Sequence, residues 1–214
     1  MSASSAALLP AQDAPTALLD SAAHAYAAFR SVRAPFEQTL TNATTGSVEV
    51  ARGEFFQRGP SRFAFRFSEP AGDAIVCDGN TVWVYLPSTA KGQVLKMTVE
   101  SGPDLDLFTQ LLTAPREHYK VAVRRDTTIG AHAAASFVLT PRQEGAPFLR
   151  ATLRIGRDDA LLWQLEMVEP TGLVRRLTFS SIQPNAELPP GAVTFAVPEG
   201  VRVIDQESLF GKKP

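Results

Sequence analysis

Residues 53–67 read Gly-Glu-Phe-Phe-Gln-Arg-Gly-Pro-Ser-Arg-Phe-Ala-Phe-Arg-Phe, and this stretch decides the fold. The Gly-Pro pair at 59–60 divides it into two runs, as expected of a turn between two strands. Because successive side chains of a strand point to opposite faces, Phe63, Phe65 and Phe67 share one face. The stretch therefore predicts strands with an aromatic face. That face belongs either to an ordinary core or to a cavity that binds acyl chains, where each buried methylene contributes about 0.8 kcal/mol.

The same period of two recurs through most of the chain, between short clusters of Gly, Pro, Asn and Asp. Asp78-Gly79-Asn80 is a strong hairpin signal, because glycine accepts the positive φ of a tight turn. Strands do not alternate with helices in the way that builds a parallel sheet. Roughly eleven short strands with this spacing predict a mainly β chain, in which an antiparallel sheet curls into a barrel or half-barrel. The strands are expected at residues 36–40, 47–56, 62–67, 74–77, 81–85, 93–99, 119–124, 134–140, 149–155, 162–168, 174–180 and 194–197.

Two segments have helical periodicity instead. The first runs from Pro15 to about Val32 and is expected to end near residue 33, because Pro35 cannot continue a helix. The second spans residues 103–114, and its apolar stripe consists of Leu105, Phe108, Leu111 and Leu112. Residues 1–14 are rich in Ser, Ala and Pro and are expected to be an unstructured N-terminal segment. Residues 15–214 are then expected to form a single domain.

Composition excludes several classes of function. The 214 residues (23.1 kDa) include 44% hydrophobic residues, which is ordinary globular composition. Lys and Arg (21) nearly balance Asp and Glu (22), so no overall positive field is available for binding nucleic acid. No apolar run approaches the length of a membrane-spanning helix. The N-terminal residues lack the features of an intact secretory signal, so the protein is either cytoplasmic or has lost its signal peptide.

Few residues point to catalysis. His24, His118 and His132 are not spaced as metal ligands, and the chain has no nucleophile elbow, phosphate-binding loop or dinucleotide-binding motif. Cys77 is the single cysteine and falls in a β run, which favours a buried, inert thiol. The residues alone therefore single out no catalytic site, no metal site and no cofactor site.

Four segments, in this order, resemble the LolA family, the periplasmic carriers of outer-membrane lipoproteins. They are Phe36-Glu37-Gln38 after the first helix, the stretch from Gly53 to Phe65, the hairpin from Val76 to Tyr85, and the stretch from Phe195 to Val203. Each motif is weak by itself, but four in the same order with matching helix placement are fairly specific. The resemblance covers about residues 17–205.

The resemblance implies an incomplete antiparallel β-barrel, a half-barrel, with an α-helical lid over a hydrophobic cavity. It also implies a periplasmic chaperone without enzymatic activity, which binds the acyl chains of lipoproteins and carries them from the inner to the outer membrane. The implied partners are acylated lipoproteins, an inner-membrane ABC transporter and an outer-membrane receptor, and the carrier is expected to be a monomer. The expected lipid-binding residues are Phe36, Phe55, Phe63, Phe65, Leu105, Phe108, Leu111 and Leu112.

An arginine latch for the lid is a further implication of the resemblance. Where the family has this arginine, just before a proline, the chain has Gly59, and Arg58 stands one residue earlier. A shift of one residue along a strand reverses the face, so Arg58 can replace the latch only if a bulge at Gly59 restores its direction. The same half-barrel also occurs in enzymes and in other hydrophobic-ligand carriers or sensors. For a small-molecule enzyme the chain offers scattered polar candidates, namely Tyr85, Glu166 and Arg58.

Overall fold

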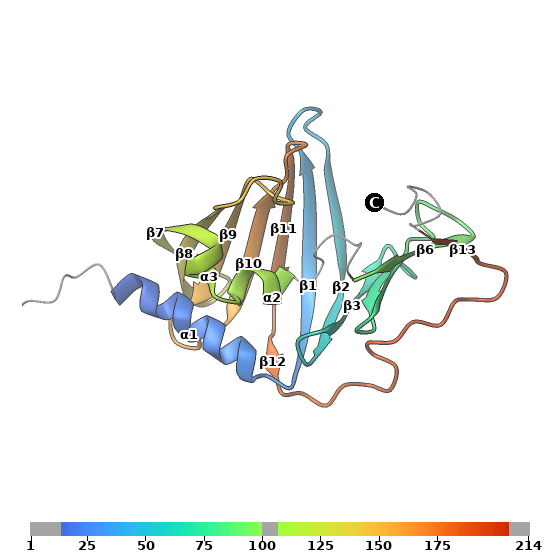
Figure 1. The fold of residues 1–214 in the computed structure, drawn as a ribbon, viewed down its shortest axis with the longest axis horizontal. Helices are drawn as coiled ribbons and strands as arrows, with labels where there is room; N and C mark the ends of the chain where they lie inside the picture. The colour runs from blue at the N-terminus through green and yellow to red at the C-terminus, as the bar shows by residue number, and fades with distance from the viewer. Residues whose placement is uncertain (1–13, 100–106, 206–214) are drawn as a thin grey trace, which may run out of the picture.

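The strands form one open sheet, seen in Figure 1 as a fan with helices in front of one half. The computed structural model describes residues 14–99 and 107–205. The strands of these residues are β1 (Ser31–Asn42), β2 (Val48–Arg58), β3 (Arg62–Glu69), β4 (Ala74–Cys77), β5 (Thr81–Tyr85), β6 (Gln93–Thr98), β7 (Tyr119–Ile129), β8 (His132–Pro141), β9 (Arg150–Gly156), β10 (Leu162–Val168), β11 (Leu173–Phe179), β12 (Gln183–Pro184) and β13 (Arg202–Asp205). The helices are α1 (Ala14–Ala28), α2 (Leu107–Leu112) and α3 (Pro115–His118).

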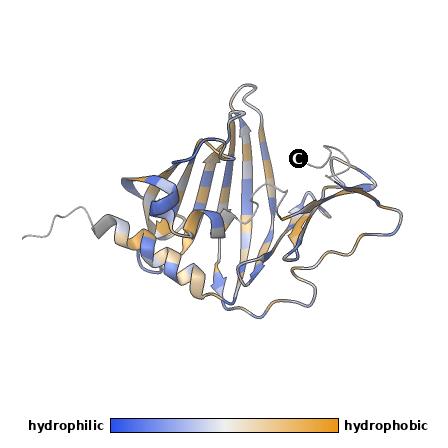
Figure 2. Ribbon diagram, in the orientation of Figure 1, coloured by the Kyte–Doolittle hydropathy of each residue, from blue (hydrophilic) through white to orange (hydrophobic). Residues whose placement is uncertain are grey.

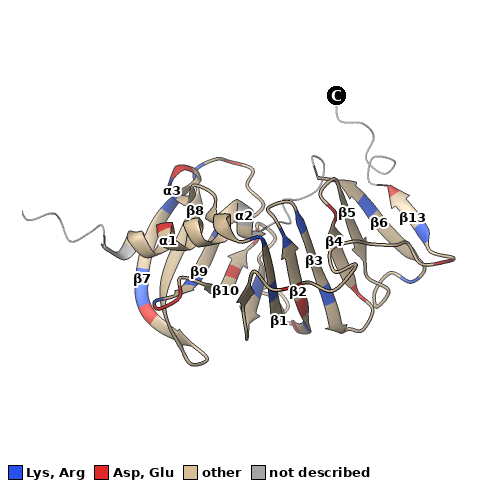
Figure 3. Ribbon diagram, turned by 90° about the horizontal axis from the view of Figure 1, so that it is seen from below, with Lys and Arg blue, Asp and Glu red and all other residues tan. Residues whose placement is uncertain are grey.

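The sheet consists of two meanders that meet at β1. Its order is β13-β6-β5-β4-β3-β2-β1-β11-β10-β9-β8-β7, and β12 also pairs with β1. All neighbours are antiparallel except β13, which pairs with β6 in parallel. The two ends of this order, β7 and β13, do not pair with each other, so the sheet is curved but unclosed (Figure 3). The predicted mainly β half-barrel with a small helical lid is therefore confirmed.

The helices cover the concave face of one half of the sheet. In Figure 1, α1 lies across the lower ends of β8–β11, and α2 and α3 lie beside it, while none of the described helices covers β4–β6. Alternating orange and blue bands along the strands in Figure 2 reflect the period of two. The main core combines this concave face with residues of α1 and α2. Its helical members are Leu19, Ala22, Phe108, Leu111 and Leu112.

A C-terminal strap, residues 185–201, covers the opposite, convex face of β2–β4. A second apolar cluster joins Leu188, Ala192 and Val193 of the strap to Phe56 and Val76 of the sheet. The Arg66 guanidinium fastens the strap by donating hydrogen bonds to three of its carbonyl oxygens. The acceptors are Ala192 (3.0 Å), Gly191 (2.8 Å) and Thr194 (2.7 Å).

The turn chemistry of the quoted stretch explains how β2 and β3 pair. Gly59 opens the connection with a φ of +61°, which a residue with a side chain adopts only with strain. Earlier in β2, the pairing with β3 is irregular between Arg52 and Gly53. A Cβ atom at Gly53 would lie 2.1 Å from the carbonyl oxygen of Arg66, which is too close, so this position requires glycine. The hairpin predicted around Asp78 is also present, and the Asp78 carboxylate accepts hydrogen bonds from the backbone N–H groups of Asn80 and Thr81.

Two local predictions are wrong, and one short helix is not predicted. The first helix ends at Ala28 rather than near residue 33, because residues 31–34 already pair with β2. Pro35 instead lies within β1, and its carbonyl oxygen accepts a hydrogen bond from the Ser180 N–H. Its nitrogen faces the gap between β11 and β12, so the missing N–H of proline costs the sheet no hydrogen bond. Residues 194–197 form no strand, since they belong to the strap. The second helix is followed by α3, a separate turn that the apolar stripe does not predict.

Two predictions lie partly outside the described residues. The unstructured segment was expected at residues 1–14, of which only Ala14 is described, as the first residue of α1. The second helix was expected from residue 103, and the structure describes it from Leu107 onward. Cys77, by contrast, is buried as predicted, and its thiol donates to the carbonyl oxygen of Ser61 (3.2 Å).

Replacing Arg66 by Leu should release the strap, because three carbonyl oxygens lose a charged donor. We expect the free energy of unfolding to fall by about 2 kcal/mol and the melting temperature by about 4–8 °C. Differential scanning calorimetry measures both. Arg52→Leu is the matched control, since Arg52 is exposed and its ion pairs with Glu37 and Glu69 are solvated, so its melting temperature should barely change. Equal losses in the two variants would show that the Arg66 bonds do not hold the strap.

Candidate functional site

Four predicted lipid-binding residues lie together on the concave face. Phe36, Phe55, Phe63 and Phe65 are each at most 7% exposed. The Phe65 ring contacts the rings of Phe36 (5.3 Å between centroids), Phe55 (4.9 Å) and Phe63 (6.2 Å). Most of these pairs are edge-on or tilted, as aromatic rings prefer. The face is therefore a continuous aromatic surface across β1, β2 and β3, and its role in binding lipid stays a prediction.

Phe108 of α2 fills the space above this aromatic surface. Its ring centroid lies 4.9 Å from that of Phe55, 5.5 Å from that of Phe179 and 5.6 Å from that of Tyr26. The side chains of Leu111 and Leu112, one turn later, are also buried. Leu105, the remaining predicted lipid-binding residue, lies outside the described residues. In this state α2 occupies the place where an apolar ligand would contact the sheet.

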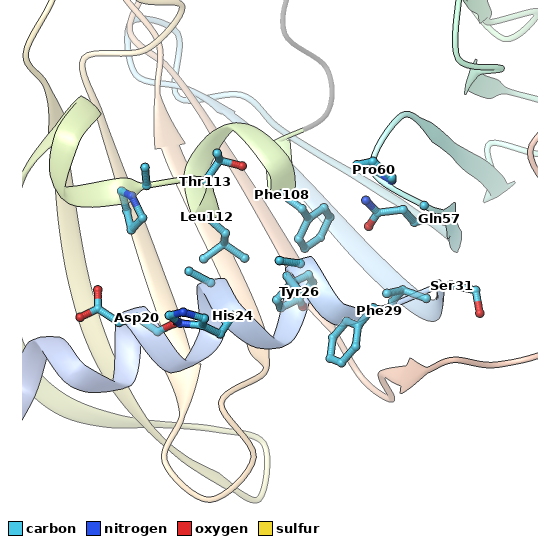
Figure 4. A pocket seen from close by; sticks show the side chains of 16 residues that line it. Asp20, His24, Tyr26, Phe29, Ser31, Gln57, Pro60, Phe108, Leu112 and Thr113 are labelled. Carbon is cyan, nitrogen blue, oxygen red and sulfur yellow. The ribbon is translucent and has the colours of Figure 1, made fainter.

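A cleft of about 520 Å³ opens beside Phe108, between α1, α2 and the ends of β1 and β2 (Figure 4). This volume falls within the usual range of small-ligand pockets, about 300–1,000 Å³. Its apolar walls include Tyr26, Phe29, Val32, Phe108 and Leu112. Phe108 and Leu112 belong to both the cleft and the core, so a displacement of α2 would join the cleft to the aromatic surface.

The helices that cover the site carry almost no charge. Asp20 is the single charged residue of α1 and α2, as the tan helices of Figure 3 show. Arg116 of α3 donates to the Asp20 carboxylate (2.6 Å) at the rim of the cleft. Both side chains are nearly half exposed, so this ion pair is weak. It links α1 to the segment that carries Phe108.

The structure does not place Arg58 at the lid. Arg58 is the last residue of β2, and its side chain is exposed. Within residues 14–99 and 107–205 it makes no hydrogen bond or ion pair with α1, α2 or α3. Gly59 donates its backbone N–H to Arg30, and it forms part of a turn rather than a bulge that would redirect Arg58. The latch predicted at Arg58 therefore stays a sequence-based prediction that no contact supports.

Two polar side chains of the cleft stand out in their apolar surroundings. The hydroxyl of Tyr26 and the Oε1 atom of Gln57 are buried, and neither has a hydrogen-bond partner among the described residues. Burial raises the pKa of Tyr26, and an interaction with the Leu162 backbone offsets this rise only in part, so the phenol stays neutral. The cleft thus has the neutral carboxamide of Gln57 on an otherwise apolar wall, while the Tyr26 hydroxyl lies near Leu162 and Asp159.

The family model described as outer membrane lipoprotein carrier protein LolA matches residues 27–196 of this chain. The chain belongs to the LolA family. Among its relatives, the outer-membrane lipoprotein carrier proteins of Salmonella paratyphi B and Salmonella typhi are each 26% identical over 178 residues, with 82% of both chains covered. Family members with this name are carriers rather than enzymes. The expectation that the chain is a non-enzymatic, chaperone-like carrier is thereby confirmed at the level of the family.

Solved structures agree with the fold. An uncharacterized conserved protein from Thermus thermophilus is 13% identical and has a TM-score of 0.55, with 92% of this chain and 100% of that chain covered. The Pseudomonas aeruginosa MucA/MucB complex contains a chain that is 15% identical, with a TM-score of 0.53 and coverage of 89% and 63%. At such low identity these similarities show the half-barrel fold alone.

Three observations on the part of the chain that the structure describes concern other kinds of site. This part contains no cluster of three or more His, Cys, Asp or Glu side chains arranged to hold a metal ion. None of its helices combines the length and the apolar character needed to cross a membrane. The polar candidates for an enzyme do not converge: Glu166 pairs with Arg176, and Tyr85 packs against Phe195 of the strap.

Sequence reasoning missed three residues of the site. Tyr26 lies on the apolar stripe of the first helix, but the stripe alone does not show that its ring stacks on Phe108 (15° between planes). Phe179 pairs with Phe36 in the β1–β11 register, a long-range contact that the period of two cannot reveal. Gln57 stands within the quoted stretch, and its position two residues after Phe55 places it on the aromatic face.

If acyl chains bind on the concave face, as the sequence predicts, Phe108 competes with them, and its size and its polarity should have opposite effects on binding. Phe108→Ala should lower the free energy of unfolding by about 3 kcal/mol and tighten binding of a fluorescent acyl chain about tenfold. Phe108→Asp should cost similar stability but weaken binding, because a carboxylate would enter the apolar site. Thermal melts and probe titrations measure both quantities. Parallel loss of stability and affinity in both variants would mean that Phe108 is only a core residue.

We expect Arg116, through its ion pair with Asp20, to restrain the lid, and Arg58 not to do so. Arg116→Leu should raise acyl-probe affinity about twofold at low salt, since a solvated ion pair contributes little. This gain should vanish at high salt, where the pair is screened. Arg58→Leu should leave affinity unchanged under both conditions. Titrations at the two ionic strengths decide the question, and an effect confined to Arg58→Leu would restore the latch expected from the family resemblance.

Proposed function

We propose that this chain is a periplasmic carrier that binds the acyl chains of lipoproteins on its concave aromatic face. Membership of the LolA family supports this proposal, and the observation that carries it is Phe108 resting on that face. Phe108 is an apolar group on α2, where it contacts the rings of Phe55 and Phe179. A single hydrogen bond from the Tyr119 hydroxyl to the Gln110 carbonyl oxygen (3.3 Å) and the weak Asp20–Arg116 ion pair add to these contacts. Acyl chains are as apolar as the Phe108 ring, so they can take its place on the aromatic face.

The proposed route takes the lipoprotein from an inner-membrane ABC transporter to an outer-membrane receptor, with the carrier acting as a monomer. An acyl chain gains about 0.8 kcal/mol for each methylene that it buries, so a long chain can offset the displacement of a single phenylalanine. Handing the cargo on requires the reverse exchange, in which Phe108 returns to the aromatic surface. The unclosed sheet suits such an exchange, because displacement of α2 would expose the aromatic face and join it to the cleft.

Gel filtration tests the proposal with a purified acylated lipoprotein diluted out of detergent in the presence of the carrier. We expect the lipoprotein to stay in solution and to co-elute with the carrier at the mass of one copy of each. The same lipoprotein without its acyl chains is the matched control and should elute separately. Precipitation of the acylated form despite the carrier, or equal co-elution of the deacylated form, would contradict the proposal.

A further inference from the structure

The strand β7 ends the sheet on the side of the helices, and its outer edge pairs with no strand of the described residues. It is the last strand of the sheet order and forms the outer margin of the sheet in Figure 3. Its ladder with β8 is regular from Tyr119 to Arg124 and is interrupted between Arg124 and Thr127. Lys120, Ala122 and Arg124 are exposed. Such an edge offers unpaired backbone N–H and C=O groups to an added strand.

On the concave side, this edge presents an apolar row. Val121 lies opposite Leu139 of β8 and Val123 opposite Phe137, and both partners are buried. Val123 is itself 41% exposed, because no further strand of the described residues shields its outer side. A strand added to β7 would place side chains directly beside this row. The row therefore favours apolar residues at alternate positions of the added strand.

On the convex side, the same edge is basic. Lys120 and Arg124 lie on this face, and neither forms an ion pair with another described residue. Arg150 on β9 adds an exposed positive charge to the same face. The single acidic residue of β7, β8 and β9 is Asp126, which is paired with Arg157. The convex side of the edge therefore favours acidic residues in an added strand.

Basic residues elsewhere on the convex face are matched by acids across the strands. Arg33 of β1 pairs with Glu54 of β2, and Arg52 of β2 pairs with both Glu37 (3.0 Å) and Glu69 (2.7 Å). The unpaired cations of β7 are therefore a feature of this edge and not of the whole face.

A second copy of the chain does not fit the edge. In a symmetric antiparallel pair centred on Ala122, Lys120 of one copy would face Arg124 of the other. Like charges directly opposite each other destabilise a strand pair, and basic residues on edge strands protect against such self-association. The same two side chains would instead stabilise a strand that carries carboxylates at these positions.

We propose that β7 is a docking edge for an extended segment of a partner protein in which acidic and apolar residues alternate. This segment adds a strand to the sheet beside residues 119–124. Its carboxylates face Lys120 and Arg124, and its apolar side chains cover Val121 and Val123. The inference does not depend on the proposed function, because it concerns the edge of the sheet and not the aromatic face. Since β7 directly follows α3, the docked segment lies beside the lid helices.

Fluorescence anisotropy with labelled peptides tests the docking edge. The probe is a capped seven-residue peptide of alternating Glu and Val. One control peptide has Lys in place of Glu, and a second has the composition of the probe with its Glu residues in one block. We expect the probe to bind about tenfold more tightly than either control, since only the probe matches both faces of the edge.

Amide hydrogen exchange, followed by NMR, detects the added strand itself. Alternate N–H groups of an edge strand point outward, and an added strand protects them from solvent. The probe should therefore slow exchange at alternate residues between Tyr119 and Arg124. Attraction between charges alone would leave exchange on β7 unchanged.

Variants on two strands of the same face provide the matched control. Arg124→Glu on β7 should weaken binding of the probe about fivefold, whereas Arg150→Glu, two strands away on β9, should weaken it by no more than about twofold. Lys120→Glu combined with Arg124→Glu should bind the lysine peptide in place of the probe. All these side chains are exposed, so the melting temperatures should barely change.

Failure of the probe to bind, or binding that does not slow exchange on β7, would overturn the inference. Equal losses in Arg124→Glu and Arg150→Glu would overturn it as well. If both variants also lost binding to vesicles of anionic phospholipid equally, the basic face would be assigned to a membrane surface instead. None of these outcomes affects the acyl-chain site, which the acyl-probe titrations test separately.

Discussion

The aromatic face of β1, β2 and β3 cannot be left in water, and the rest of the structure follows from this constraint. Each phenylalanine that it buries contributes roughly 1.5–3 kcal/mol. The 15-residue α1 and the six-residue α2 are too short to be stable alone in water, so their helical structure depends on packing against this face. The sheet thus holds its own lid by the same apolar surface to which we assign the acyl chains of the cargo.

The two faces of the sheet are covered in different ways. On the convex face the strap is held by apolar packing and by three hydrogen bonds from Arg66, whose directions fix one arrangement. On the concave face Phe108 is held by the rings of neighbouring residues, and its helix by the solvated Asp20–Arg116 pair and one hydrogen bond from the Tyr119 hydroxyl to the Gln110 carbonyl oxygen (3.3 Å). Directional bonds resist replacement, whereas ring contacts can be exchanged for methylenes at small cost. The molecule therefore combines a fixed outer cover with an exchangeable inner one.

The period of two and the turn residues predict most of the strands, because side-chain alternation and positive φ are local properties. What failed depends on contacts between distant residues. Pro35 marks no helix end, since the pairing of residues 31–34 with β2 decides where β1 begins. Residues 194–197 have the composition of a strand, but Arg66 binds the carbonyl oxygen of Thr194. For the site, alternation finds Phe55 and Phe65, yet only the structure shows that Gln57 and Tyr26 lack partners and that Arg58 is exposed.

The affinity of a carrier for its cargo depends on its lid as well as on its cavity. Because cargo can bind only to molecules whose aromatic face is free, the observed affinity is the intrinsic affinity multiplied by the open fraction. A side chain that is larger than Phe108 or more firmly held would exclude cargo. Without any such side chain, the carrier would hold its cargo too firmly to release it. A single ring in contact with Tyr26, Phe55 and Phe179 lies between these extremes.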